Sequence, residues 1–101
     1  MSSSAMELSG PRAQSVVVTD DSLTVDVVDG RTVSVSLSWY PRLSHASPSE
    51  RDNWRLIGQG EGIHWPDIDE DIHVDGLLRG RPSGESQDSL KRWLAGRQGT
   101  G

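Results

Sequence analysis

The chain has 101 residues, the size of one small domain, and 33% of them are apolar. The absence of Cys excludes disulfides, thiolate metal ligands and cysteine catalysis. No apolar run approaches the roughly 18 residues of a membrane span, and the N-terminus lacks the basic start and apolar core of a secretory signal. We therefore expect a cytoplasmic protein with no membrane contact. The net charge of −5 argues against a nucleic-acid partner.

The composition along the chain predicts one folded unit between two unstructured ends. The first dozen residues are Ser-rich and aperiodic, and the last six contain three Gly and no apolar residue. We expect a disordered arm at 1–12, a single α+β domain at 13–82, a C-terminal helix at 83–95 and a flexible tail at 96–101.

Three strands are predicted near the N-terminus from β-branched and alternating apolar residues, at 15–19, 23–27 and 33–39. A two-residue turn between the second and third strands would put their apolar residues on opposite faces. A three-residue loop at 28–30 sets Val25 opposite Val33, so that one face is apolar throughout. Gly30 then occupies the loop position that requires a positive φ.

The remaining elements are short. Ser47 followed by Pro48 and Glu50 is typical of a helix start with a capping box, which predicts a helix at 48–54. Apolar patterning predicts strands at 55–57 and 62–65, a helical turn at 74–78 and a final helix capped by Ser83 or Ser86. The predicted fold class is α+β: a small antiparallel sheet with a β-hairpin, one short helix and a C-terminal helix.

The predicted core comes mainly from the strands, and Trp54 should pack on it. Its members are Val16, Val25, Val33, Val35, Leu37, Trp39 and Leu56. Trp65 lies in an acidic segment, where it can be either core or an interface anchor.

Nearly all of the negative charge lies in residues 61–75, which contain no Lys or Arg. The segment has a charge of −6. Because the whole chain has a net charge of −5, the rest of the chain carries +1. Its acidic residues are Glu61, Asp67, Asp69, Glu70, Asp71 and Asp75. One interpretation is a solvated loop whose Asp side chains cap turns. Another is a surface that binds a cationic partner.

The same segment contains residue types for metal binding and for acid–base catalysis. Asp67, Asp69 and Asp71 match the D-x-D-x-D opening of a calcium loop, but the later glycine and glutamate of that loop are replaced by Ile72 and Leu78. Adding His64 or His73 would suit a transition metal, although the spacing matches no known motif. His64 beside Glu61 and Asp67 supplies the groups of a general acid–base pair. The sequence assigns no cofactor, no metal and no catalytic residue.

Several motifs resemble a bacterial family called domain of unknown function 2442, over about 13–82. They are W-Y-P-R-L at 39–43, residues 46–50, Trp54, the string G-E-G-I-H-W-P-D-I-D-E-D-I at 60–72 and G-L-L-R-G at 76–80. The resemblance implies a small α+β domain and a companion protein encoded nearby, in an antitoxin-like or accessory role. Some members resemble the first half of proteins that carry a helix-turn-helix domain in their second half. Residues 83–101 of this sequence allow only one helix, which is too short for such a domain. The family has no assigned catalytic residues.

We therefore expect a non-enzymatic protein-interaction module, the accessory or antitoxin-like member of a two-protein system. Its expected partner is a basic protein bound through 61–75, by Glu61, His64, Trp65, Asp67, Ile68, Asp69, Glu70 and Asp71. One alternative is a small metal-binding protein or enzyme that uses His64, Asp67, Asp69 and Asp71. A second alternative is a DNA-binding transcriptional regulator.

Overall fold

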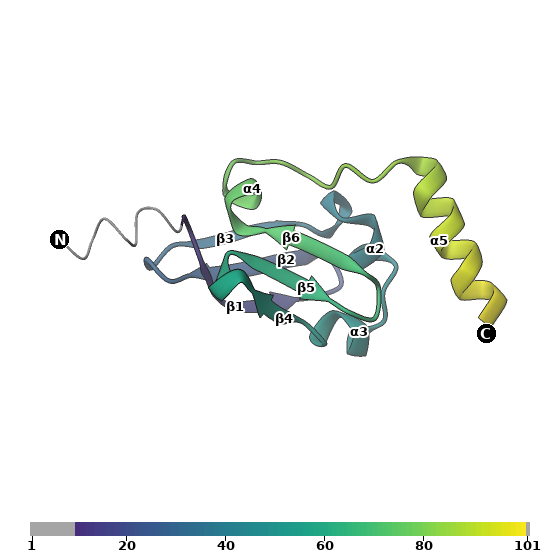
Figure 1. Ribbon diagram of the computed structural model, residues 1–101, viewed down its shortest axis with the longest axis horizontal. Helices are drawn as coiled ribbons and strands as arrows, with labels where there is room; N and C mark the ends of the chain where they lie inside the picture. The colour runs from purple at the N-terminus through teal and green to yellow at the C-terminus, as the bar shows by residue number, and fades with distance from the viewer. Residues whose placement is uncertain (1–9, 101) are drawn as a thin grey trace.

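The chain folds around two three-stranded antiparallel sheets, with strand orders β1-β2-β3 and β4-β5-β6 (Figure 1). The computed structural model describes residues 10–100, with side chains as far as Arg97. The first sheet contains β1 (Ala13–Val18), β2 (Ser22–Val27) and β3 (Thr32–Ser36), and the second contains β4 (Arg55–Ile57), β5 (Gly62–Trp65) and β6 (Glu70–His73). The α+β class is confirmed, with two small sheets instead of one.

The hairpin of β2 and β3 has the predicted register. Val25 pairs with Val33 and Leu23 with Val35. The loop is closed by a hydrogen bond of 2.9 Å from the amide of Gly30 to the carbonyl of Val27, and Gly30 has a φ of +100°. Only the three-residue loop keeps the apolar side chains of both strands on one face, and burial of that face decides the register.

The third strand ends earlier than predicted. Leu37, Ser38 and Trp39 form a 3₁₀ helix, η1 (Leu37–Trp39), although their alternation continues that of β3. The Ser36 hydroxyl accepts the amide of Ser38 at 3.2 Å and so offers the backbone a cap in place of a ladder bond. Leu37 nevertheless points inward and is buried.

The helices are short, apart from the last one. They are α2 (Pro41–Ser44), α3 (Pro48–Asp52), α4 (Val74–Leu78) and α5 (Gln87–Thr100), with a second 3₁₀ turn, η2 (Gly58–Gly60). The capping box of α3 is confirmed: the Ser47 hydroxyl accepts the amide of Glu50, and the Glu50 carboxylate accepts the amide of Ser47. The strands β4 and β5 and the turn α4 also lie where the pattern predicted them. Helix α2 was not predicted; Pro41 starts it, as proline at a first helical position does.

One hydrophobic core lies between the inner faces of the two sheets. Leu23, Val25 and Val27 of β2 share a single cluster with Ile63 and Trp65 of β5 and with Ile72 of β6. Of the predicted members, Val16, Val25 and Leu37 are buried, whereas Val33, Val35, Trp39 and Trp54 are partly buried and pack against the cluster. Leu56 is 38% exposed, so its assignment to the core was wrong. It lies on β4, an edge strand with a neighbour on only one side.

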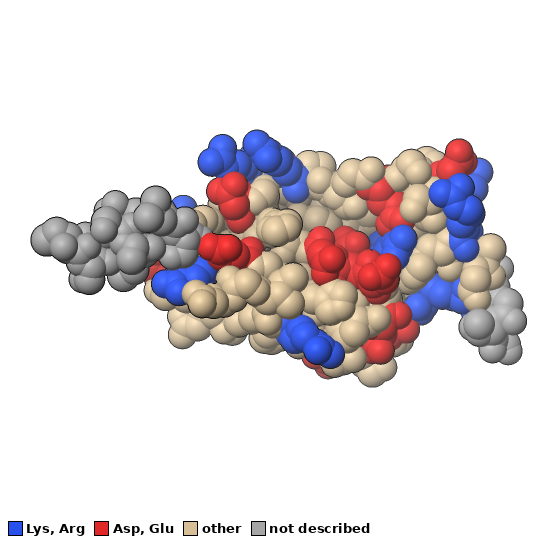
Figure 2. All heavy atoms as spheres, in the orientation of Figure 1, with Lys and Arg blue, Asp and Glu red and all other residues tan. Residues whose placement is uncertain are grey.

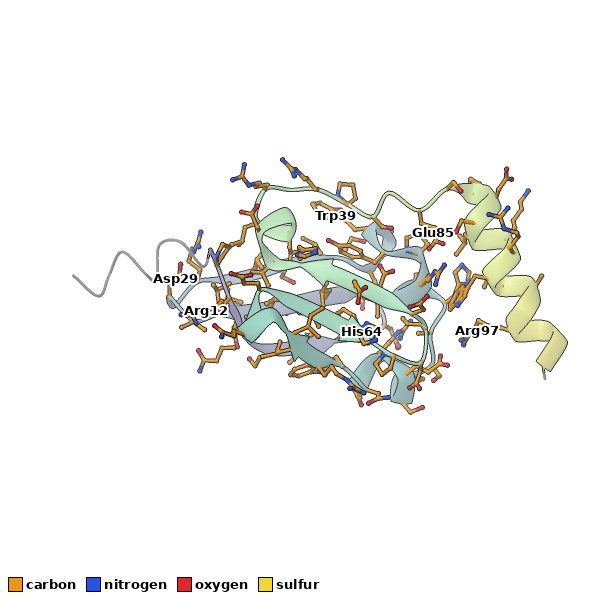
Figure 3. All side chains as sticks on the ribbon, in the orientation of Figure 1. Arg12, Asp29, Trp39, His64, Glu85 and Arg97 are labelled. Carbon is orange, nitrogen blue, oxygen red and sulfur yellow. The ribbon has the colours of Figure 1, made fainter. Side chains whose placement is uncertain are left out.

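Both ends of the chain depart from the expected boundaries. Most of the arm predicted at 1–12 lies outside the described residues, but the carbonyl of Arg12 accepts the amide of Val28 at 2.9 Å. Helix α5 continues to Thr100, beyond the expected end at 95, and lies at the far end of the molecule from Arg12 (Figures 1 and 3). In the part of the chain that the structure describes, no helix has the length and apolar character to cross a bilayer.

Candidate functional site

Seven of the eight predicted site residues lie on the hairpin of β5 and β6, and Glu61 lies just before β5. The acidic composition of this segment gave no sign of strand β6. Residues 66–69 form the turn, and β6 follows at Glu70. Ile63 pairs with Ile72, His64 with Asp71 and Trp65 with Glu70. Because side chains alternate across a sheet, this register divides the acidic segment between the core and the solvent.

Trp65 and Ile68 are core residues, so their prediction as apolar contacts to a partner was wrong. Their exposed fractions are 0% and 1%. Trp65 faces the other sheet, and its indole N–H donates to the carbonyl of Arg51 at 3.0 Å. The turn brings Ile68 back over the core, and its carbonyl accepts the guanidinium of Arg42 at 3.0 Å. A sheet with so few large apolar residues needs both of them inside.

Three carboxylates remain exposed at the turn end of the hairpin: those of Asp67, Asp69 and Asp71. Asp67 accepts a hydrogen bond of 2.9 Å from the side-chain amide of Asn53. Asp69 has a φ of +53°, a conformation that Asp tolerates better than most residues. Glu61, at the other end of β5, is half-buried. Figure 2 shows acidic side chains gathered on this face of the molecule.

His64 pairs with Asp71, and not with Glu61 or Asp67 as the acid–base interpretation required. The two residues face each other across β5 and β6 on the outer side of the sheet, and Nδ1 of His64 bonds a carboxylate oxygen of Asp71. Arg55 is the cross-strand neighbour of His64 on β4. Among residues 10–97, no group of three or more His, Asp and Glu side chains is arranged to hold a metal ion. Of the three Asp residues in the D-x-D-x-D match, Asp67 and Asp69 lie in the turn, whereas Asp71 lies on β6 and bonds His64.

Glu70 differs from the other acidic residues because its strand position points inward. It is half-buried on the Trp65 side of the sheet. Burial, together with the nearby carboxylate of Glu85, raises the pKa of Glu70 to about 7, against the opposing effect of Arg42. Glu70 is therefore less accessible to a partner than Asp67, Asp69 and Asp71, and its predicted role in partner binding stays a prediction.

The interactions around Arg42 were invisible to sequence reasoning. Its guanidinium makes a two-pronged ion pair with Glu85, with N–O distances of 2.8 and 2.9 Å, and also donates to the carbonyls of Ile68 and Asp69. It lies over the ring of Trp93, 5.2 Å from the centroid. Arg42 and Glu85 are 43 residues apart, and no local pattern joins them.

The architecture is that of a small α+β domain with two packed three-stranded sheets and a C-terminal helix. The chain belongs to the family described as "Protein of unknown function (DUF2442)", whose model matches residues 13–83, in agreement with the resemblance in its motifs.

Two solved structures share the fold. A protein of unknown function from Rhodospirillum rubrum is 26% identical, with a TM-score of 0.63 over 79% of this chain and 96% of that one. An uncharacterised protein from Chromobacterium violaceum is 20% identical, with a TM-score of 0.64 over 90% of this chain and 86% of that one. No curated protein matches the chain.

Proposed function

We propose that this protein is a cytosolic, non-enzymatic interaction module that binds a basic protein partner through the exposed carboxylates of Asp67, Asp69 and Asp71. The observation that carries the proposal is their exposed position at the turn end of one hairpin, in a segment without Lys or Arg. We call these three residues the acidic turn.

Electrostatics supports a cationic partner for the acidic turn. Like charges held close together repel one another, and an approaching cationic surface relieves that repulsion. The nearby Arg42 forms its ion pair with Glu85 and donates only to backbone carbonyls of the turn, so the carboxylates of Asp67, Asp69 and Asp71 stay exposed. A negative field at an exposed turn mainly speeds association, and salt screens it over about 8 Å at physiological ionic strength.

The buried residues of the hairpin contribute by holding the turn in place. Trp65 and Ile68 anchor the two sides of the turn to the core, so the carboxylates are presented on a rigid support. Apolar contact with a partner is available from Ile57, which is 38% exposed on the outer side of the same sheet. His64 and Asp71 lie on that side also.

The accessory or antitoxin-like role is the finer part of the proposal, and it rests on the family resemblance. A neutralising protein needs a surface that its companion recognises, and the acidic turn supplies one. The geometry of the described residues offers no support for the metal-binding alternative.

The test compares two variants with the same change of net charge. Asp67→Asn/Asp69→Asn/Asp71→Asn neutralises the acidic turn with side chains of the same shape, and Asn tolerates the positive φ at position 69. The matched control is Asp21→Asn/Asp29→Asn/Asp88→Asn, whose sites are exposed and lie outside the β5–β6 hairpin.

Tagged wild-type protein is first used to purify a partner from the native cells, and the association rate with that partner is then measured at low and high salt. The acidic-turn variant should associate more slowly and lose the salt dependence, while the control behaves like the wild type. If both variants associate alike, or if the partner contacts another face, the proposal is wrong. A melting temperature that falls sharply only in the acidic-turn variant would show that the carboxylates are structural.

A further inference from the structure

Among the side chains that the structure describes, one row links helix α5 to the domain through hydrogen bonds and ion pairs. Glu85, Ser89, Trp93 and Arg97 are spaced four residues apart, which places them along one side of the helix and the turn before it. Glu85 pairs with Arg42, and Arg97 pairs with Glu50 at 2.8 and 3.1 Å. Ser89 donates to Glu85 at 2.6 Å. Figure 3 shows Glu85 and Arg97 at this end of the domain. We call residues 85–97 the clasp.

Arg42 is the central group of the attachment. Nε and Nη2 donate to the two carboxylate oxygens of Glu85, and Nη1 donates to the carbonyls of Ile68 and Asp69. Two guanidiniums lie over the ring of Trp93, with the Cζ atoms of Arg42 and Arg97 at 5.2 and 4.7 Å from the ring centroid. Loss of the Arg42–Glu85 pair therefore also weakens the contact between the Arg42 guanidinium and the Trp93 ring.

Glu70 follows Asp69, whose carbonyl accepts Nη1 of Arg42 at 3.3 Å, and its strand position points inward. The hydrogen bonds of Arg42 go to Glu85 and to the carbonyls of Ile68 and Asp69, and not to the carboxylate of Glu70. The charged and titratable groups that interact electrostatically with Glu70 are Tyr40, Arg42, Asp69, Asp71 and Glu85. Three of these five are acidic, and Arg42 is the cation among them. Burial, followed by the charge of Glu70, raises the pKa of Tyr40 to about 12.

We propose that Glu70 and Glu85 compete for Arg42, and that this competition makes the docking of α5 dependent on pH. While Glu70 is protonated, Arg42 is left to Glu85 and the clasp is closed. When Glu70 loses its proton, its carboxylate repels Glu85 and attracts Arg42, and the clasp opens. Trp93 and the underlying Arg42 and Glu50 are then exposed together.

The sign of the effect follows from proton linkage. Glu70 has a pKa of about 7 with the clasp closed, and removal of Glu85 and greater contact with water would both lower that pKa. The closed state therefore holds the proton more tightly, so rising pH favours the open state. The hydrogen bond from Arg42 holds the pKa of Glu85 below its ordinary value, so Glu85 stays ionised throughout this range. We expect the clasp to be closed near pH 5.5, to loosen as the pH rises towards about 7 and to change little above that pH.

NMR spectroscopy of the full chain at about pH 5.5 and about pH 8.5 tests the proposal, through the ring carbons of Trp93 and the methyl groups of Leu94, which do not exchange with water. In the wild type, these signals should shift towards those of an exposed helix at the higher pH. Each unit by which opening lowers the pKa of Glu70 should reduce the closed-to-open ratio about tenfold.

Glu70→Gln should keep the clasp closed at both pH values, because the amide is neutral and of similar shape. Glu61→Gln makes the same change in charge away from Arg42 and should respond to pH like the wild type. Glu85→Gln should loosen the clasp at both pH values. An unchanged wild-type spectrum, or a pH response that persists in Glu70→Gln, would overturn the proposal. None of these measurements involves a partner, so they stand or fall separately from the proposed interaction function.

Discussion

Trp65→Ala should lower the free energy of unfolding by about 3–5 kcal/mol, because the side chain is fully buried between the sheets. Part of the loss comes from the transfer of a large aromatic surface, and part from the cavity that alanine leaves in a domain with few large apolar residues. The variant also leaves the carbonyl of Arg51 without its indole donor. Since a domain of this size has a total stability of about 5–15 kcal/mol, a large share of the molecules should be unfolded on mild heating.

Two companion variants separate the contributions. Trp65→Phe keeps most of the aromatic volume and removes the indole N–H, and we expect a loss of about 1–3 kcal/mol. Trp39→Ala removes a tryptophan that is only partly buried, so its loss should be smaller than that of Trp65→Ala. Urea denaturation followed by circular dichroism measures all three.

An interface anchor would give the opposite pattern. If Trp65→Ala unfolds at the same urea concentration as the wild type and only partner binding is weakened, the reasoning from burial is refuted. The same conclusion would follow if Trp39→Ala were the more damaging change.

Three further predictions concern local geometry and pH. Gly30→Ala should lower the free energy of unfolding by about 1 kcal/mol, because the φ of +100° suits glycine. In thermal melts Gly60→Ala should be more destabilising, because its Cβ would also lie 2.9 Å from the carbonyl oxygen of Ala13. Equal losses of stability would show that this close approach is unimportant. Ser47→Ala removes one half of the capping box and should cost about 1 kcal/mol in urea titrations, whereas Ser49→Ala, on the same helix, should cost less. Glu70 has a folded pKa of about 7, above its ordinary value, so its ionisation opposes folding. Stability measured by urea titration should therefore decline as pH rises from about 5 to about 8, and Glu70→Gln should remove that decline; a parallel decline in the variant would assign the effect to another group.

Local sequence determined much of the first half of the fold. The alternation of Val and Ser required one register for the β2–β3 hairpin, because a shift of one residue would turn every apolar side chain to the wrong face. The capping box at Ser47 and Glu50 defined the start of α3 from four consecutive residues. Such features depend on neighbours in the chain or on a single strand pair, so they can be predicted without knowing the rest of the molecule.

The candidate site was determined by tertiary structure. Residues 61–75 look like one acidic surface in the sequence, but the β5–β6 register turns Glu70 inward with Trp65 and leaves Asp71 outside with His64. Which face of that hairpin is buried depends on the first sheet, against which it packs. The contact of Arg42 with Glu85 likewise depends on where α5 docks. Burial and charge proximity are properties of residues brought together over long separations, and only the packed structure specifies them.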